Sequence, residues 1–305
     1  MSNRYDFTMT AKDGAKLRCY EWAPEEPRAV VVIVHGMAEH AARYGRFAGA
    51  LNEAGFAAVS MDLRGHGQSA AGGMKGWFAK KNGWKAVLED IRQLSLWACE
   101  KYPGVPLVLY GHSMGSVFAR ASIFLYGDMY RAALMTAVAT DLPLRRDIAP
   151  LIAWFVGLVQ GGGRPSPLLD SLTFGSFNKP YQPAQTRFEW LNRDRAEVDR
   201  YVADDNCGFI STASLFYDVS VVLVKTLRKR NIRRIPKSLP ILMLSGSDDP
   251  AGLFGKTVKQ LERSYRAEGL DARSKIYEGA RHELLNEINR EEVIKDIVMF
   301  IDSNI

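Results

Sequence analysis

The chain has 305 residues, a hydrophobic content of 47% and a formal net charge of +6. This length permits one large domain or two small ones, and the hydrophobic content is enough for a large core. Its three cysteines, Cys19, Cys99 and Cys207, form no C-x-x-C pair, which argues against a disulfide framework and a structural zinc site. The N-terminus lacks a charged start followed by an apolar run, so we expect no signal peptide and a cytoplasmic protein.

The positive charge is concentrated in one segment. Its cations have no acidic residue among them and outnumber the net charge; they are Lys225, Arg228, Lys229, Arg230, Arg233, Arg234 and Lys237. Such a segment is typical of a patch for anionic lipid or nucleic acid, but it also suits a solvated helix end, where cations interact with the dipole. Because no aromatic residue interleaves it, we favour the helix end and expect no nucleic-acid partner.

Predicted strands and helices alternate along the first 140 or so residues. A hairpin is expected around the Lys12-Asp13-Gly14 turn, and the later strands are continuous apolar runs, typical of a parallel sheet buried on both faces. The predicted strands are 7–10, 16–22, 29–34, 56–61, 106–110 and 131–136. The predicted helices are 41–54, 84–102 and 114–126.

The alternation stops near residue 142 and resumes at about residue 236. Between these points the chain carries prolines, the run Gly161-Gly162-Gly163 and short predicted helices. Strands 239–244 and 272–277 and helices 255–268 and 291–301 then follow. We therefore predict an α/β fold, a mostly parallel sheet flanked by helices, built from residues 1–141 and 236–305 and interrupted by an insertion at 142–235.

The segment Gly111-His112-Ser113-Met114-Gly115 matches G-x-S-x-G between a predicted strand and a predicted helix. In a nucleophile elbow the serine occupies a tight strand-to-helix turn, and the flanking glycines allow neighbouring chain to approach closely. The pentapeptide is short enough to occur by chance, so the strand-turn-helix setting carries the assignment. We predict that Ser113 is a nucleophile and that Gly111 and Gly115 are elbow glycines.

A serine nucleophile needs a base, which is usually a histidine. In an elbow of this kind the histidine comes after both the serine and the acid along the chain. Of the five histidines, at positions 35, 40, 66, 112 and 282, one follows Ser113, namely His282. Taken alone, His282 would be interpreted as a surface histidine in a polar loop. Chain order instead predicts that His282 is the base.

The acid is expected at the end of the strand that precedes this histidine. Asp248 and Asp249 both follow strand 239–244, and a carboxylate here can accept the His282 N–H and fix the imidazole tautomer. Either residue could do so. We prefer Asp249, because Pro250 restricts it to an extended conformation, and interpret Asp248 as an ordinary turn residue.

An oxyanion hole is expected from two backbone N–H groups. One belongs to the residue after the nucleophile, Met114, and the other to the loop that follows strand 29–34, where Met37 is the candidate. We interpret His35 in this loop as a structural ring packed beneath the elbow.

Several segments in a fixed order carry motifs: HGMAEHAARY (35–44), MDLRGHGQS (61–69), GHSMGS (111–116), GSDDP (246–250) and ARHELLNE (280–287). Together they resemble the monoacylglycerol lipase and lysophospholipase branch of the α/β-hydrolases, and RDRAEVDRYVADDNCGF (193–209) resembles the insertion of its bacterial members. The resemblance spans nearly the whole chain. It implies a Ser113, Asp249 and His282 triad, an oxyanion hole at Met37 and Met114, and a helical lid at 142–235.

The resemblance implies a serine hydrolase of fatty-acyl esters, such as monoacylglycerol or lysophospholipid, that works through an acyl-enzyme. This chemistry needs no metal and no organic cofactor. One departure is that Ala251 and Gly252 follow the Asp-Pro pair, where members often have a branched aliphatic residue and then glycine. It leaves the adjacent pocket wall undefined.

The apolar run 151–159 has two interpretations that stay open. It is too short to span a bilayer. It is either a lid face that contacts an acyl chain or, transiently, a membrane surface, or a helix packed onto the core. The same choice, acyl pocket or core, applies to the aromatic residues Phe174, Phe177, Phe188, Trp190, Phe209 and Phe216. We expect a protein that can lie peripherally at a membrane.

Three rival functions are considered. Residues 65–70 fit G-x-G-x-x-A of nucleotide-binding enzymes, but Gly72 and Gly73 follow, so no helix is expected there to hold a pyrophosphate. A non-catalytic binding protein on the same fold is disfavoured because no triad member is missing. A peptidase or thioesterase with the same triad is not separable by sequence, because the pocket decides between them.

Overall fold

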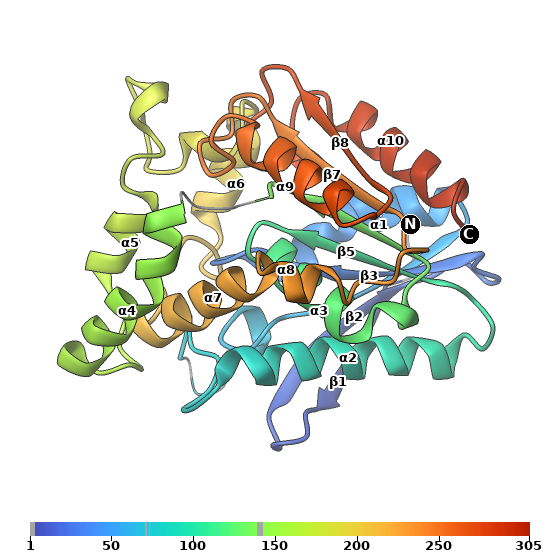
Figure 1. Ribbon diagram of the computed structural model, residues 1–305, viewed down its shortest axis with the longest axis horizontal. Coiled ribbons are helices and arrows are strands. Elements are labelled where there is room, and N and C mark those ends of the chain that lie inside the picture. Colours follow the sequence, from blue (N-terminus) through green and yellow to red (C-terminus); the bar gives the residue numbers. More distant parts are fainter. Residues whose placement is uncertain (1–3, 71, 73, 139–142) are drawn as a thin grey trace.

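One sheet of eight strands forms the centre of the molecule (Figure 1). The computed structural model describes residues 4–70, 72, 74–138 and 143–305, and all counts refer to these. The strands are β1 (Arg4–Thr10), β2 (Lys16–Trp22), β3 (Ala29–Val34), β4 (Phe56–Met61), β5 (Leu107–His112), β6 (Ala132–Thr136), β7 (Ile241–Gly246) and β8 (Ala272–Tyr277). Their spatial order is β1-β2-β4-β3-β5-β6-β7-β8. Strand β2 is antiparallel to β1 and β4, and all pairs from β4 to β8 are parallel.

Helices cover both faces of this sheet. The core helices are α1 (Gly45–Glu53), α2 (Gly83–Lys101), α3 (Met114–Tyr126), α9 (Lys256–Ala267) and α10 (Arg290–Asp302). Side chains alternate along the strands. Val30 and Val32 of β3 therefore belong to the core cluster that includes residues of α2, α3 and α9, while Val31 and Ile33 belong to the cluster that includes residues of α1 and α10. Strand β3 is buried throughout, as expected of a parallel strand covered on both faces. The predicted α/β fold with a mostly parallel sheet is confirmed.

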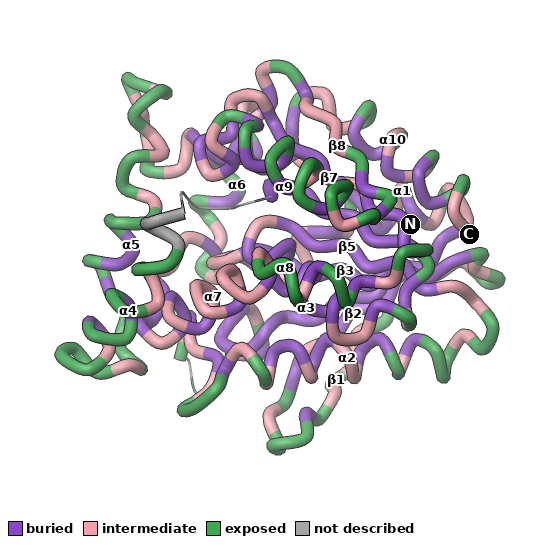
Figure 2. Tube along the Cα trace, viewed as in Figure 1, coloured by how far each residue is buried: buried purple, intermediate pink, exposed green. Residues whose placement is uncertain are grey.

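Five helices lie between β6 and β7. They are α4 (Pro143–Gln160), α5 (Pro167–Phe174), α6 (Arg195–Ala203), α7 (Ala213–Thr226) and α8 (Lys229–Ile232). Figure 1 shows α4, α5 and α6 at one end of the molecule, beyond the sheet, and Figure 2 shows exposed residues along the outer sides of α4 and α5. The expected boundary of the insertion, at residues 141 and 142, lies outside the described residues.

The prediction of short helical pieces in this region is right for α5, α6 and α8 but wrong for α4 and α7. Helix α4 continues through Pro150, and α7 is a long, regular helix. The prediction treated prolines as breaks, because a proline removes one intrahelical hydrogen bond. Ala153 and Val156 of α4 are buried against α7, and this packing stabilises the helix across the proline.

The ends of two strands also differ from the prediction. Strands β5 and β7 each extend two residues further than predicted, to His112 and Gly246. They therefore continue up to the segments that carry Ser113 and Asp249. Strand β1 begins three residues earlier than predicted, at Arg4. The pairing of β1 with β2 as a hairpin and the positions of β3, β4, α3 and β8 are as predicted.

Candidate active site

Ser113 lies on a sharp turn between β5 and α3. Its φ of 52° and ψ of −116° are unusual for a residue with a side chain, and the turn is held because its N–H donates to Thr136 O at 3.0 Å. A Cβ on Gly115 would lie 2.0 Å from Val34 O, and one on Gly111 would lie 2.5 Å from Gly115 O. Both glycines are therefore required by close approach of neighbouring backbone, which is the geometry of a nucleophile elbow.

His282 connects Ser113 to Asp249. Its Nε2 lies 2.9 Å from Ser113 Oγ, and its Nδ1 lies 2.9 Å from Asp249 Oδ1. Asp249 is fully buried, and the same Oδ1 accepts the N–H of Ala251 at 2.9 Å. The structure thus joins the three residues predicted from sequence in one chain of hydrogen bonds.

The other predicted candidate for the acid, Asp248, points elsewhere. Its carboxylate accepts the Ser247 hydroxyl at 2.9 Å, and its backbone N–H donates to Ala280 O. It therefore belongs to the turn that joins the aspartate loop to the histidine loop. Gly246 permits this contact, because a Cβ there would lie 1.9 Å from Ala280 O.

Two histidines at the site have opposite pKa shifts. Burial would lower the pKa of His282, but the negative charge of Asp249 and the hydrogen bond to it outweigh burial, so this pKa is raised. Burial lowers the pKa of His112 to about 4, although His112 also lies beside the cavity. His112 is therefore neutral near pH 7, and its Nδ1 pairs with Thr136 Oγ1 at 2.9 Å.

The loop of residues 35–40 lies opposite the elbow. Met37 follows β3 and borders the cavity, whereas the side chain of Met114 is buried behind Ser113 at the start of α3. The first N–H groups of a helix have no partner within it, so the N–H of Met114 is suited to an oxyanion. His35 is structural, as expected, because its Nε2 accepts the Leu63 N–H at 2.9 Å and burial holds its pKa well below the usual value. Its ring packs against the ring of His66.

A buried charge network shapes this loop. Glu39 Oε1 accepts the Gly36 N–H at 2.5 Å and the Tyr44 hydroxyl at 2.9 Å. Arg43 bridges Glu39 and Glu283 with three contacts of 2.7 to 2.9 Å. Burial would raise the pKa of Glu39, but Arg43 and the other donors hold it below its usual value. The network fixes the direction of the Gly36 N–H in this loop and the position of Glu283, the residue that follows His282.

The insertion holds the same loop from the other side. Ala38 has a positive φ of 54°, and its carbonyl accepts the Tyr201 hydroxyl at 2.8 Å and the Gly208 N–H at 2.9 Å. His40 Nε2 lies 2.8 Å from Asp204 Oδ2. Three contacts from segment 201–208 therefore position the loop that carries Met37.

The insertion also holds the histidine loop. The centroids of the Trp190 and His282 rings lie 4.7 Å apart, and Leu191 O accepts the Glu283 N–H at 2.8 Å. Glu287 is fully buried and accepts from Arg193 Nε at 2.8 Å and from the Arg281 N–H at 2.9 Å. Residues 190–193 thus fix the backbone on both sides of His282.

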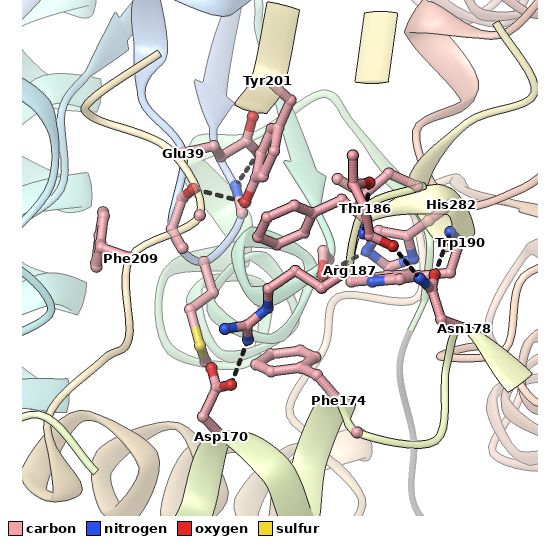
Figure 3. A pocket seen from close by; sticks show the side chains of 18 of the residues that line it. Glu39, Asp170, Phe174, Asn178, Thr186, Arg187, Trp190, Tyr201, Phe209 and His282 are labelled. Atoms are coloured by element: carbon pink, nitrogen blue, oxygen red, sulfur yellow. Dashed lines mark hydrogen bonds and ion pairs between the residues drawn. The ribbon is translucent and has the colours of Figure 1, made fainter. Parts of the chain in front are cut away.

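A cavity of about 640 Å³ lies over Ser113 and His282, between the core loops and the insertion. Its outer wall contains Phe174, Phe188, Trp190 and Phe209, together with polar residues, while Phe216 is buried below it and Phe177 packs on Trp190. Figure 3 shows Arg187 reaching across the cavity to Asp170, its ion-pair partner. Four of the six aromatic residues therefore line the cavity, whereas Phe177 and Phe216 pack beside it.

Within the described residues, one group of side chains has the spacing of a metal site. The ligand atoms of His40, Asp204 and Cys207 lie within 4.8 Å of one another. They lie outside the hydrogen-bond chain of Ser113. The rival nucleotide segment, 65–70, forms a short 3-10 turn at Gly67–Ser69, whose Gln68 N–H donates to Asp62 at 2.8 Å.

Sequence reasoning missed the residues that hold the site loops, such as Glu39, Arg43, Trp190, Tyr201 and Glu287. Glu39 and Arg43 lie inside HGMAEHAARY, and Glu287 ends ARHELLNE, so charged residues within these motifs were an available signal. Trp190 and Tyr201 lie in the insertion. Their contacts with the catalytic loops join positions that are distant in sequence and have no local pattern.

The doubly covered sheet, the strained serine and the serine–histidine–aspartate chain define an α/β-hydrolase of the serine type. The comparisons give the family: the chain belongs to the Hydrolase_4 family, described as serine aminopeptidase, S33, which matches residues 25–289.

Relatives and solved structures agree with this. The chain is 26% identical over 305 residues to a monoacylglycerol lipase of Mycolicibacterium smegmatis, covering 100% of this chain and 99% of the relative. It is 28% identical over 283 residues to a monoglyceride lipase of Mus musculus, covering 90% and 82%. A structure described as a lipase in the open form has a TM-score of 0.87 and 25% identity over 98% of each chain. A Bacillus coagulans carboxyl esterase has a TM-score of 0.92 at 24% identity, covering 100% and 99%. The resemblance to the monoacylglycerol lipase branch is confirmed.

Proposed function

We propose that this protein is a serine esterase that hydrolyses fatty-acyl monoesters of the monoacylglycerol type. The observation that carries the proposal is the Ser113–His282–Asp249 hydrogen-bond chain at the floor of a cavity whose outer wall is partly aromatic. Relatives that match 90 to 100% of the chain are described as monoacylglycerol and monoglyceride lipases. Lysophospholipid, with the same single acyl chain, is the second substrate to be compared.

The proposed reaction is acyl transfer in two steps. Ser113 Oγ attacks the ester carbonyl while His282 takes its proton, and Asp249 stabilises the resulting imidazolium. The oxyanion is bound by the N–H groups of Met37 and Met114. His282 then gives its proton to the leaving alcohol, and water, deprotonated by His282, releases the fatty acid.

The cavity supports an acyl substrate with a small polar head. Its volume lies within the range of small-molecule sites, and aromatic rings line its outer wall. Glu39, Arg187 and Asp170 add polar groups to its lining, whereas Phe174 and Phe209 offer apolar surface. An ester with one chain and a hydroxylated head matches both kinds of surface.

We assign residues 142–235 as a lid, and α4 as the element that contacts lipid. Leu151, Trp154, Phe155, Leu158 and Val159 are 52 to 71% exposed, whereas Ala153 and Val156 face α7. Such an amphipathic helix lies on a membrane surface with its apolar side in the interface. Within the described residues, the helices are too short or too polar to cross a bilayer.

The test is a series of p-nitrophenyl esters from acetyl to palmitoyl, with monoacylglycerol and lysophospholipid, on the wild type and Ser113→Ala. We expect a medium or long-chain optimum and a loss of kcat of roughly 10⁴- to 10⁶-fold in the variant. An optimum at acetyl would refute the lipase assignment. Full activity of Ser113→Ala would refute the mechanism. The absence of both ester hydrolysis and fluorophosphonate labelling of Ser113 in the wild type would favour a non-catalytic binding protein.

Peptide or thioester hydrolysis is the second candidate, because the matched family is described as a serine aminopeptidase. The same triad cleaves either bond. Aminoacyl p-nitroanilides and acyl thioesters, assayed beside the esters, distinguish them. A kcat/KM for an anilide above that for every ester would replace the esterase proposal.

A further inference from the structure

A second, smaller hollow lies on the outer surface, at the junction of α2, α3, α7 and α8. It has a volume of about 410 Å³ and shares no lining residue with the active-site cavity. Its lining combines apolar and cationic side chains, namely Trp84, Phe124, Leu125, Lys225, Arg230, Asn231 and Arg234. Helices α2, α3 and α7 pack on one another around it (Figure 1). We call it the cationic cleft.

The cations at the cleft are not neutralised by acidic residues. Within the described part of the chain, Lys225, Arg228, Arg230 and Arg234 have no carboxylate within ion-pair distance, although Arg233 pairs with Glu268 at 2.7 Å. Burial, followed by repulsion from Arg228, Arg230 and Lys85, lowers the pKa of Lys225. A bound anion would relieve this repulsion.

Aromatic rings form the floor of the cleft. Lys225 Nζ lies 4.9 Å from the centroid of the Trp84 ring, and the Arg234 guanidinium lies 5.8 Å from that of Phe124. These rings come from α2 and α3, so they are absent from segment 225–237, and the sequence-based preference for a plain helix end overlooked them. The fold thus places the half-buried Trp84 and the buried Phe124 beside Lys225 and the exposed Arg234. Aromatic rings next to cations are the combination typical of membrane-interface sites.

We infer that the cationic cleft docks the protein on an anionic phospholipid surface, with a phosphate head between Lys225, Arg230 and Arg234 and apolar contact with Trp84. A lipid surface fits better than one small anion, because exposed cations continue beyond the cleft at Arg228, Lys229 and Lys237. This site differs from the exposed face of α4 at 151–159, whose side chains are apolar and uncharged.

The test compares vesicles of phosphatidylglycerol and phosphatidylcholine in a co-flotation assay. The variant is Arg230→Gln/Arg234→Gln, since both side chains are exposed and their removal leaves the core intact. We expect wild-type protein to bind phosphatidylglycerol more tightly than phosphatidylcholine, and the variant to bind phosphatidylglycerol about 30-fold more weakly. Raising the salt concentration should weaken wild-type binding as well.

Two controls separate the cleft from general charge and from α4. Lys16→Gln/Lys295→Gln removes the same charge from exposed sites on β2 and α10, and it should change binding less than threefold. Trp154→Ala/Phe155→Ala should weaken binding to both vesicle types. Hydrolysis of a short, water-soluble p-nitrophenyl ester should be unchanged in Arg230→Gln/Arg234→Gln, so failure of docking is distinguishable from failure of the proposed esterase function.

Three outcomes would overturn the inference. One is equal weakening by the cleft variant and the lysine control, which means non-specific attraction. The second is tighter binding of inorganic phosphate or monomeric decanoate than of phosphatidylglycerol vesicles, which means a small-anion site. The third is tighter binding of a single-stranded oligonucleotide, which means a nucleic-acid surface.

Discussion

The two sides of the candidate active site are built in different ways. The serine side consists of β5, α3 and the neighbouring strand ends, and it is fixed by glycine contacts with backbone of the core, such as Gly115 against Val34 O. The other side consists of loops 35–40 and 279–287. Its geometry depends on contacts from the insertion, including Tyr201 to Ala38 and Leu191 to Glu283.

This difference separates a rigid half from an adjustable half. The serine turn has no free space, because a methyl group on either elbow glycine meets backbone atoms. The Met37 loop and the His282 loop are held by hydrogen bonds to residues 190–208 of the insertion. The position of both loops therefore depends on where these residues lie.

The largest expected effect tests Asp249, the acid that holds the histidine of the adjustable half. Asp249→Asn removes the charge that orients and stabilises His282, and we expect kcat to fall by roughly 10⁴-fold. The matched control is Asp248→Asn, whose side chain accepts from Ser247 instead, and it should retain kcat within about threefold. Ester hydrolysis by the purified variants measures both. Equal losses in the two variants would refute the assignment of Asp249.

The rigid half is tested by its glycine. Gly115→Ala places a methyl group 2.0 Å from Val34 O, so we expect a loss of about 2 to 3 kcal/mol in the free energy of unfolding. Gly49→Ala is the control, because a Cβ on this helical glycine has no atom within 4 Å and should stabilise α1 by up to about 1 kcal/mol. Denaturant titration gives both values. A stable Gly115→Ala protein would show that the elbow has room.

A smaller effect tests the contact between insertion and oxyanion loop. Tyr201→Phe removes one of two hydrogen bonds to Ala38 O. We expect the loss of this hydrogen bond to cost about 1 kcal/mol, which corresponds to a fivefold fall in kcat/KM. Tyr217→Phe is the control, since the Tyr217 hydroxyl has no hydrogen bond within the described residues. We expect the fall in kcat/KM of Tyr201→Phe to come from a lower kcat and not from a higher KM. A change in KM alone would assign Tyr201 to substrate binding instead.

The smallest effect is a shift in the pH profile. The neutral form of His282 is the base, so kcat/KM should rise with pH to a plateau, with a midpoint above 6.5 because Asp249 raises this pKa. His112, with a pKa of about 4, cannot produce that midpoint. The raised pKa also stabilises the fold when His282 is protonated. This contribution is complete below about pH 6.5 and is lost as pH rises through the folded-state pKa. A midpoint below 6 would contradict the described contact.

The sequence predicted the sheet and the serine side well because their signals are local. Runs such as 29–34 are apolar throughout, and the two glycines of the elbow stand beside Ser113. His282 was found by chain order, which is a property of the fold. Asp249 was separated from Asp248 by the conformation that Pro250 imposes.

What sequence could not predict is the set of contacts between distant segments. Nothing near Tyr201 indicates that its hydroxyl meets Ala38, and nothing in 225–237 indicates that Trp84 lies beside Lys225. Helix α4 was underestimated because Pro150 is a helix breaker by local rules. In each case tertiary packing decides what local propensity leaves open.

The two hydrogen bonds on the Ala38 carbonyl determine how this protein can be recombined with its relatives. Tyr201 and Gly208, together with residues 190–193, are partners of the core even though they belong to the insertion. A chimera that exchanges all of 142–235 also exchanges supports of the oxyanion and histidine loops. Helices α4 and α5, which carry the apolar outer face, can be exchanged without losing these supports. In such a chimera segment 178–210 keeps the sequence of this protein.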